Sequence, residues 1–123
     1  MQSQNSKLKV ELKHRAYEYS IKAIEFIDTL PRDRSTDVIA KQLLRSATSI
    51  GANIVEAKGA SSKRDFTNFF SHALKSANES LYWLGLLRDA KKINNTHLEY
   101  LLKETGELAN ILGSSILTLK GKK

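Results

Sequence analysis

The sequence predicts an all-α protein, specifically an antiparallel up-down-up-down four-helix bundle. Its 123 residues contain one proline and are rich in Leu, Ala, Lys and Glu, which favour helices. Apolar residues recur at spacings of three and four along four segments that short polar stretches separate. Helices of that length joined by short loops pack as an antiparallel bundle. We expect a single domain over residues 1–123, with frayed ends at 1–6 and 120–123.

The first helix is predicted over residues 7–30. It ends there because Pro31 disfavours helical geometry at Leu30. Its apolar residues give two neighbouring series at helical spacing, which lie side by side on the helix. The first series is Tyr17, Ile21, Ile24 and Ile27, and the second is Ala16, Ala23, Phe26 and Leu30.

The second helix is predicted over residues 36–58. Ser35 or Thr36 can cap its first turn, and Gly59 is a plausible C-terminal stop. Its core stripe centres on three residues, which are Leu43, Ile50 and Ile54.

The third helix is predicted from a cap at Ser61 or Ser62 to about Lys92, and the pair Asn94-Asn95 marks the next turn. The fourth helix is predicted over residues 96–119. Both carry long apolar series at helical spacing, so each should bury one face in the bundle.

The second helix also carries a separate stripe beside its core-facing one, formed by Leu44, Thr48, Gly51 and Val55. In the third helix, Trp83 and Leu86 likewise lie off the main stripe. These flanks are either the edges of a wide core-facing sector or a surface between subunits. A small residue such as Gly51 lets another backbone approach closely. We expect a homo-oligomer.

Several residues inside the predicted helices are not explained by helix propensity or by core packing. Gly51 and Asn53 are poor residues for the middle of a helix. Unpaired buried polar groups are costly, so hydrogen bonds from such residues can fix one register and one assembly. We therefore interpret a set of polar residues as structural, between helices or between subunits: Arg45, Asn53, Glu56 and Glu79.

The net charge of +7 is expected to lie at one end of the bundle. Folding the chain up and down brings ten basic residues to one end, against only Glu11, Glu56 and Asp65. We call this set the basic pole: Lys7, Lys9, Lys13, Arg15, Lys58, Lys63, Arg64, Lys120, Lys122 and Lys123. The first seven are the predicted contacts to RNA or DNA backbones, because neutralised phosphates release counterions. The last three alternatively serve solubility alone.

Several classes of protein are disfavoured by residues that are missing. The chain has no cysteine, hence neither disulfides nor thiolate metal sites. It has no apolar run long enough to span a membrane, and we expect a cytoplasmic protein. The only Glu-x-x-His pair is Glu11 and His14, where a di-iron site needs two. No serine elbow or phosphate-binding glycine loop is present. We predict no catalytic residue, no metal and no cofactor, with a metal-dependent enzyme as the remote alternative.

The run QLLRSATSIGANIVEA, residues 42–57, resembles the signature of the ribosomal RNA (23S rRNA) intervening-sequence protein family. Members are also called four-helix bundle proteins and were once labelled S23 ribosomal proteins. The stretch FIDTLPRD before it resembles the end of the family's first helix, and SSKRDFTNFFSHALKSANESLYWLGLLRDA after it resembles the third helix. Ala57 stands where many members have glycine.

The resemblance implies a left-handed bundle assembled into a ring-shaped homopentamer. A related branch of the family serves diversity-generating retroelements, as an accessory protein that binds a reverse transcriptase and nucleic acid through a basic surface. We therefore expect a non-enzymatic homo-oligomer, a pentamer by resemblance, that binds RNA or DNA backbone through its basic pole. The alternative is a protein-interaction scaffold or reverse-transcriptase accessory subunit that binds no nucleic acid itself.

Overall fold

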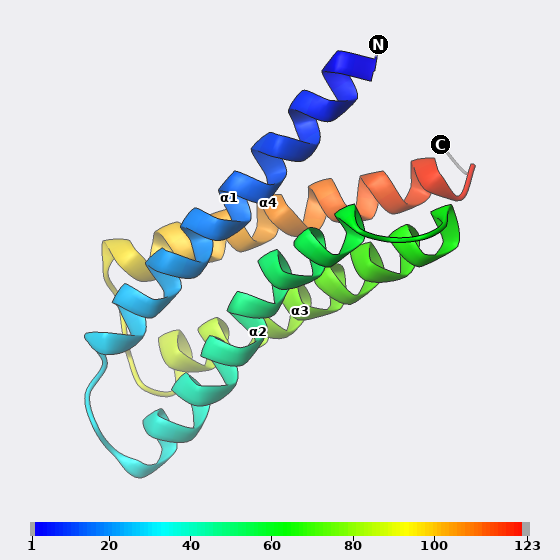
Figure 1. Cartoon of the computed structure of the whole chain (residues 1–123). Coiled ribbons are helices and arrows are strands. Elements are labelled where there is room, and N and C mark those ends of the chain that lie inside the picture. Colours follow the sequence, from blue (N-terminus) through cyan, green and yellow to red (C-terminus); the bar gives the residue numbers. More distant parts are fainter. Residues whose placement is uncertain (1, 122–123) are drawn as a thin grey trace.

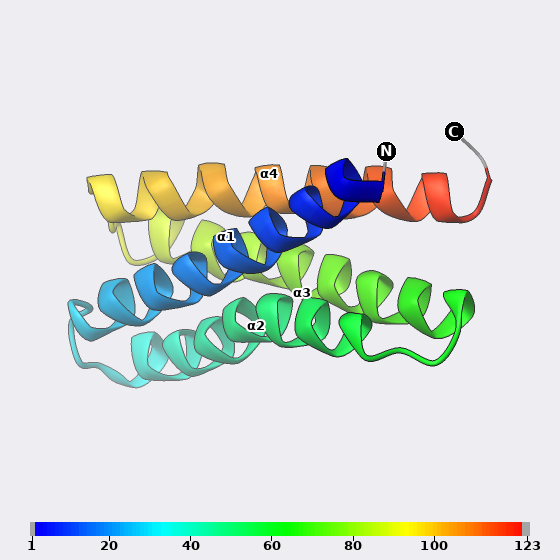
Figure 2. The same ribbon diagram turned by 45° about the horizontal axis from the view of Figure 1, so that its top comes forward.

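The computed structural model describes the backbone of residues 2–121 and the side chains of residues 12–121. Those residues form four helices and no strand, as the sequence predicts. The helices are α1 (Gln2–Asp28), α2 (Arg34–Lys58), α3 (Lys63–Asp89) and α4 (Thr96–Leu119). They run alternately up and down, and the chain ends and the α2–α3 turn lie at the same end of the bundle (Figures 1 and 2). No helix of the described residues is long and apolar enough to cross a membrane.

Three helices begin at a side chain that accepts a hydrogen bond from the backbone three residues later, which satisfies an otherwise unpaired N–H. Ser62 accepts from Asp65 at 3.1 Å and Asn95 from Leu98 at 2.9 Å. The expected cap of α2 at Ser35 or Thr36 is wrong. Asp33 caps α2 instead, at 2.9 Å from the Thr36 nitrogen. That N–H favours the ionised carboxylate and lowers the pKa of Asp33 to about 2.

Two helix ends also differ from the prediction. α1 stops at Asp28, where the Thr29 and Leu30 N–H groups turn back to Phe26 and Ile27. α3 stops at Asp89, three residues before the predicted end. Lys92 lies in the left-handed region at φ 59°, and Ile93 N–H reaches back to the Leu87 carbonyl at 3.1 Å. That reversal ends the helix in place of a glycine.

The core runs the length of the bundle and contains the predicted stripes of α2, α3 and α4. Leu43, Ile50 and Leu84 are fully buried. In α1 the second of the two predicted series is the buried one. The helix buries Leu12, Ala16, Tyr19, Ala23, Phe26 and Leu30, while Tyr17 is 66% and Ile24 43% exposed.

Polar bonds inside the core join helices that are distant in the sequence. The hydroxyls of Ser46 and Ser80 lie 2.8 Å apart between α2 and α3. The Tyr19 hydroxyl bonds Thr105 between α1 and α4, and Thr105 in turn donates to the Leu101 carbonyl. Burial raises the pKa of Tyr19 to about 12. Buried polar groups that are satisfied in this way fix the register of neighbouring helices.

Candidate nucleic-acid interface

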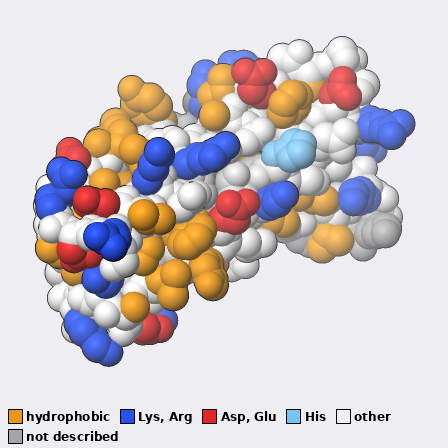
Figure 3. Space-filling model, turned by 90° about the horizontal axis from the view of Figure 1, so that it is seen from below, with side chains coloured by type: hydrophobic (Ala, Val, Ile, Leu, Met, Phe, Trp, Pro, Cys, Tyr) orange, Lys and Arg blue, Asp and Glu red, His pale blue; other side chains and the backbone are white. Residues whose placement is uncertain are grey.

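Six members of the basic pole have described side chains: Lys13, Arg15, Lys58, Lys63, Arg64 and Lys120. The last four lie where the α2–α3 turn and the end of α4 meet at one end of the bundle (Figure 1). Lys13 and Arg15 lie farther from that end, at the middle of α1. Lys7 and Lys9 lie on the α1 backbone, but their side chains are outside the described residues, as are Lys122 and Lys123. On the face drawn in Figure 3, acidic and basic side chains mix at one end, while the other end is mostly basic.

The two ends differ in how their cations are paired. Away from the basic pole, Arg32 pairs with Asp37 at 2.9 Å and Lys91 with Asp33 at 3.1 Å. Arg34 and Lys41 form no ion pair with described residues there. Among the described residues of the basic pole, five exposed cations form no ion pair: Lys13, Lys58, Lys63, Arg64 and Lys120. The nearby acid Asp65 accepts a hydrogen bond from Ser61 at 2.8 Å instead. The positive potential of this end is therefore uncompensated by ion pairs among described residues.

Arg15 behaves differently from the other five. Its guanidinium donates to Glu104 at 2.9 and 2.6 Å and to Glu107 at 3.0 Å, which joins α1 to α4. These carboxylates raise the Arg15 pKa, mainly through the hydrogen bond to Glu104. Of the predicted backbone-contacting residues with described side chains, Arg15 is the one already engaged within the chain.

The second stripe of α2 borders a groove between α1 and α2. The α1–α2 groove is lined by Tyr17 and Ser20 of α1, with Lys13 and His14, and by Thr48, Gly51, Ala52 and Val55 of α2. Leu44 belongs to the same stripe and is 38% exposed, and Val55 is 47% exposed. Tyr17 was not predicted to be part of this surface. The sequence pattern could have indicated it, because Tyr17 lies at helical spacing on a stripe separate from the buried one.

Packing within one chain explains why residue 51 is a glycine. A Cβ built on Gly51 would lie 3.4 Å from the Ala16 Cβ and 3.5 Å from the Ala16 carbonyl oxygen. The backbone that approaches Gly51 closely is therefore α1 of the same chain. The small residue fits α1 against α2 at the floor of the α1–α2 groove.

Trp83 and Leu86 are half-buried on α3 and are not brought into the α1–α2 groove. Trp83 packs against the core. Its indole Nε1 is buried and has no hydrogen-bond partner among the described residues. The structure therefore separates the two sets of residues that the sequence grouped as an oligomer surface.

The predicted polar set makes no bond between helices of the described chain. Asn53 donates to the Ser49 carbonyl at 2.8 Å, within α2. The side chains of Arg45, Glu56 and Glu79 are exposed and form no hydrogen bond or ion pair with described residues. The interhelical bonds come instead from Ser46, Ser80 and the Tyr19–Thr105 pair. The sequence could have indicated a buried role for Ser46 and Ser80, because each lies within the apolar stripe of its helix.

Among residues with described side chains, no three His, Asp or Glu residues come together as a metal site would need. His14 is exposed, and Glu11, the other half of its Glu-x-x-His pair, lies outside those residues.

Known proteins resemble this chain across all four helices. A family model described as 23S rRNA-intervening sequence protein matches residues 8–114. A solved structure from Bacteroides thetaiotaomicron, a protein with unknown function from the S23 ribosomal protein family, is 38% identical with a TM-score of 0.79. That match covers 85% of this chain and 97% of the other. No curated protein matches the chain. The similarity thus extends to both fold and sequence.

Proposed function

This chain belongs to the 23S rRNA-intervening sequence protein family, and we propose that it binds RNA or DNA backbone through its basic pole without catalysing a reaction. This proposal rests mainly on the difference in ion pairing between the two ends of the bundle. Five of the six cations of the basic pole with described side chains lack an ion pair among described residues. At the other end Arg32 and Lys91 have carboxylate partners, and Arg34 and Lys41 have none among those residues. In this proposal the protein acts in the cytoplasm.

Binding of this kind is dominated by phosphate neutralisation and counterion release. Each contacted phosphate of a duplex steepens the dependence of log K on log salt by about 0.9. The cations of the basic pole sit on several elements, with Lys13 on α1 and Lys63 on α3. Such an arrangement suits a phosphate backbone, because backbone contacts position a nucleic acid but carry no base information.

We further propose that the protein is a homo-oligomer that uses the α1–α2 groove. The supporting observation is that Tyr17 and Val55, which line this groove, are each more than a third exposed, as is Leu44 of the same α2 stripe. Exposed apolar patches of this kind mark interaction surfaces. The ring of five copies that the family resemblance implies would repeat the basic pole five times and raise its avidity for one nucleic acid.

The test is fluorescence anisotropy of a labelled structured RNA, titrated with the full chain at several salt concentrations. We expect submicromolar affinity at low salt and a steep loss as salt rises. The double variant Lys63→Glu and Arg64→Glu should weaken binding at least tenfold and flatten the salt dependence. The matched control is Lys41→Glu with Lys103→Glu, the same charge change at exposed lysines outside the basic pole. A comparable loss in the control, or no binding at low salt, overturns the proposal.

The second candidate is a protein-interaction scaffold, such as an accessory subunit of a reverse transcriptase, without nucleic-acid binding of its own. The apolar α1–α2 groove favours it, because a protein partner could bind there equally well. Absence of RNA binding at low salt, together with a partner retained by the wild type and lost in Val55→Glu, would support this candidate.

A further inference from the structure

The outer side of α3 carries an unbroken series of hydrogen-bond donors. Its members follow one another at spacings of four and three, so they form a single stripe along the helix. We call it the donor stripe: Arg64, Asn68, Ser71, Lys75, Asn78 and Tyr82. None of the six is acidic, and none of their side chains forms a hydrogen bond or ion pair with a described residue. From Arg64 to Tyr82 the stripe extends for about 27 Å, at 1.5 Å per residue.

The donor stripe is continuous with the basic pole. Arg64 belongs to both, and α3 leads from the basic pole toward the other end of the bundle (Figure 2). A phosphate backbone held at the basic pole can therefore continue along α3 past Asp65, whose carboxylate accepts a hydrogen bond from Ser61. Beyond Asp65 it meets no acidic residue on α3 until Glu79. Lys75, Asn68 and Ser71 offer cationic and neutral donors to phosphate oxygens on the way.

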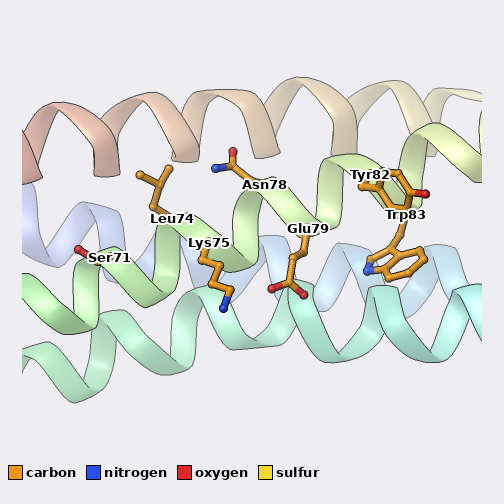
Figure 4. Close-up of a pocket in the computed structure, with 7 residues that line it drawn as sticks. All are labelled: Ser71, Leu74, Lys75, Asn78, Glu79, Tyr82 and Trp83. Carbon is orange, nitrogen blue, oxygen red and sulfur yellow. The ribbon is translucent and has the colours of Figure 1, made fainter.

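A shallow hollow lies beside the far end of the donor stripe (Figure 4). Leu74, Asn78 and Tyr82 lean toward α4, while Lys75, Glu79 and Trp83 lean toward α2. Ser71 completes the lining.

The hollow has an aromatic end whose ring is held in place. Tyr82 is 62% exposed, and its ring meets Trp83 edge to face with centroids 5.1 Å apart. Trp83 itself packs on the core, so it is a fixed support for Tyr82. A supported, exposed aromatic ring in a hollow that also contains the cationic side chain of Lys75 can stack an unpaired base.

We propose that the donor stripe binds single-stranded RNA, with phosphates along Arg64 to Lys75 and one unpaired base stacked on Tyr82. This inference rests on the proposed function and names the form of nucleic acid and a second contact surface. Asn78 and Glu79 flank the stacked base and can bond its edge. The Glu79 carboxylate repels phosphate but accepts from base amino groups, which orients the strand with its base toward the hollow.

Duplex RNA cannot make the proposed stacking contact with Tyr82. Its bases are stacked on one another inside the helix, so none is free to lie on Tyr82. A duplex can still contact the cations of the basic pole through its phosphates. The two surfaces therefore predict different responses from paired and unpaired RNA.

The experiment uses the full chain and its single tryptophan. Trp83 lines the hollow, so its fluorescence reports whether the hollow is occupied. A short unstructured RNA should quench Trp83 emission saturably. A duplex RNA of equal length should bind by anisotropy but leave that emission unchanged.

Variants at exposed tyrosines locate the contact. Tyr82→Ala should weaken single-stranded RNA roughly 5- to 100-fold, the range of base–aromatic stacking, and leave duplex affinity unchanged. Tyr82→Phe should retain binding, because the ring remains. The matched control is Tyr100→Ala, an exposed tyrosine on α4 outside the donor stripe and the hollow. Unchanged circular dichroism and thermal midpoint establish that each variant is folded.

The outcomes separate this inference from the proposed function. Equal binding of both RNAs, with Tyr82→Ala like wild type, overturns the donor stripe as a site and leaves the basic pole standing. Failure of both RNAs to bind at low salt overturns both. Binding of single-stranded RNA that depends on Tyr82 but withstands Lys58→Glu with Lys63→Glu, two exposed lysines of the basic pole outside the donor stripe, supports the donor stripe and contradicts the basic pole.

Discussion

Gly51 of α2 faces Ala16 of α1, with only 3.4 Å between the Ala16 Cβ and the place that a Gly51 Cβ would take. The contact lies at the floor of the α1–α2 groove, where two exposed apolar rows flank it. A larger side chain at residue 51 would push α1 away from α2. The spacing of the two helices, and hence the shape of the α1–α2 groove, depends on this pair.

Gly51→Leu should therefore lower the free energy of unfolding by about 1–3 kcal/mol, the usual cost of overpacking. Gly51→Ala adds a Cβ at ordinary contact distance and removes a mid-helix glycine, so it should raise that free energy by about 0.5–1 kcal/mol. Urea unfolding at one fixed protein concentration measures both. A Leu variant as stable as wild type would mean that α1 does not need this close approach.

Arg15 should stabilise the attachment of α1 to α4. Its side chain is 35% exposed and its partner Glu104 13%, so removing it leaves a largely buried carboxylate unpaired. We expect Arg15→Ala to cost about 1–2 kcal/mol in unfolding free energy. Lys22→Ala, which removes the exposed pair with Glu25, should cost about 0.5 kcal/mol or less. Equal losses in the two variants would contradict a special role for Arg15.

Because Arg15 is paired with carboxylates within the chain, its substitution should affect RNA binding less than substitution of an unpaired cation. Lys63→Ala should reduce the magnitude of the salt slope by about 1, because one phosphate contact is lost. Arg15→Ala should leave the slope unchanged, since its guanidinium already serves Glu104 and Glu107. Anisotropy titrations at several salt concentrations measure both slopes. A larger change for Arg15 than for Lys63 would refute this distinction.

Local chemistry made most of the fold predictable. Ser62 and Asn95 sit just before long apolar series, so the starts of α3 and α4 follow from their capping side chains. The start of α2 was harder, because Asp33, Ser35 and Thr36 all have capping side chains. Asp33 is the cap because its carboxylate faces the first free N–H groups, and Ser35 and Thr36 already lie inside the helix.

Features of the fold that depend on tertiary packing could not be predicted from local sequence patterns. In α1, Tyr17 and Ile24 repeat at the same helical spacing as Ala16 and Ala23, and periodicity alone cannot say which row is buried. The small row is buried because α2 lies against it at Gly51. The topology predicted that cations gather at one end, and Lys58, Lys63 and Arg64 lie beside the α2–α3 turn at that end. The pairing of Arg15 did not, since it depends on how α1 and α4 are aligned.

Tyr19 should make the protein lose stability at high pH. Its pKa is raised from 10.0 to about 12 because burial disfavours the phenolate. The neutral form is favoured by folding, so this contribution is complete below pH 10 and is lost between pH 10 and 12. A two-unit shift corresponds to about 2–3 kcal/mol. Urea midpoints at pH 9, 11 and 12 measure it.

Tyr19→Phe provides the comparison, because other tyrosines and lysines titrate in the same range. Thr105 still donates to the Leu101 carbonyl in that variant, so the loss at neutral pH should be about 1 kcal/mol or less. The alkaline decrease should be smaller in Tyr19→Phe than in wild type. Parallel curves for the two proteins would show that Tyr19 is not the source.

The α1–α2 groove should hold copies of the chain together. Val55 is 47% exposed and lines the groove, so Val55→Glu would place a carboxylate in the contact and desolvate it. We expect wild type to have a native mass of five chains and Val55→Glu to fall to a monomer, by light scattering and native mass spectrometry. The control is Val38→Glu, at an exposed valine of α2 that does not line the groove. Dissociation by both variants, or a monomeric wild type, would contradict the groove as the subunit contact, because only a residue inside that contact should be sensitive to the new charge.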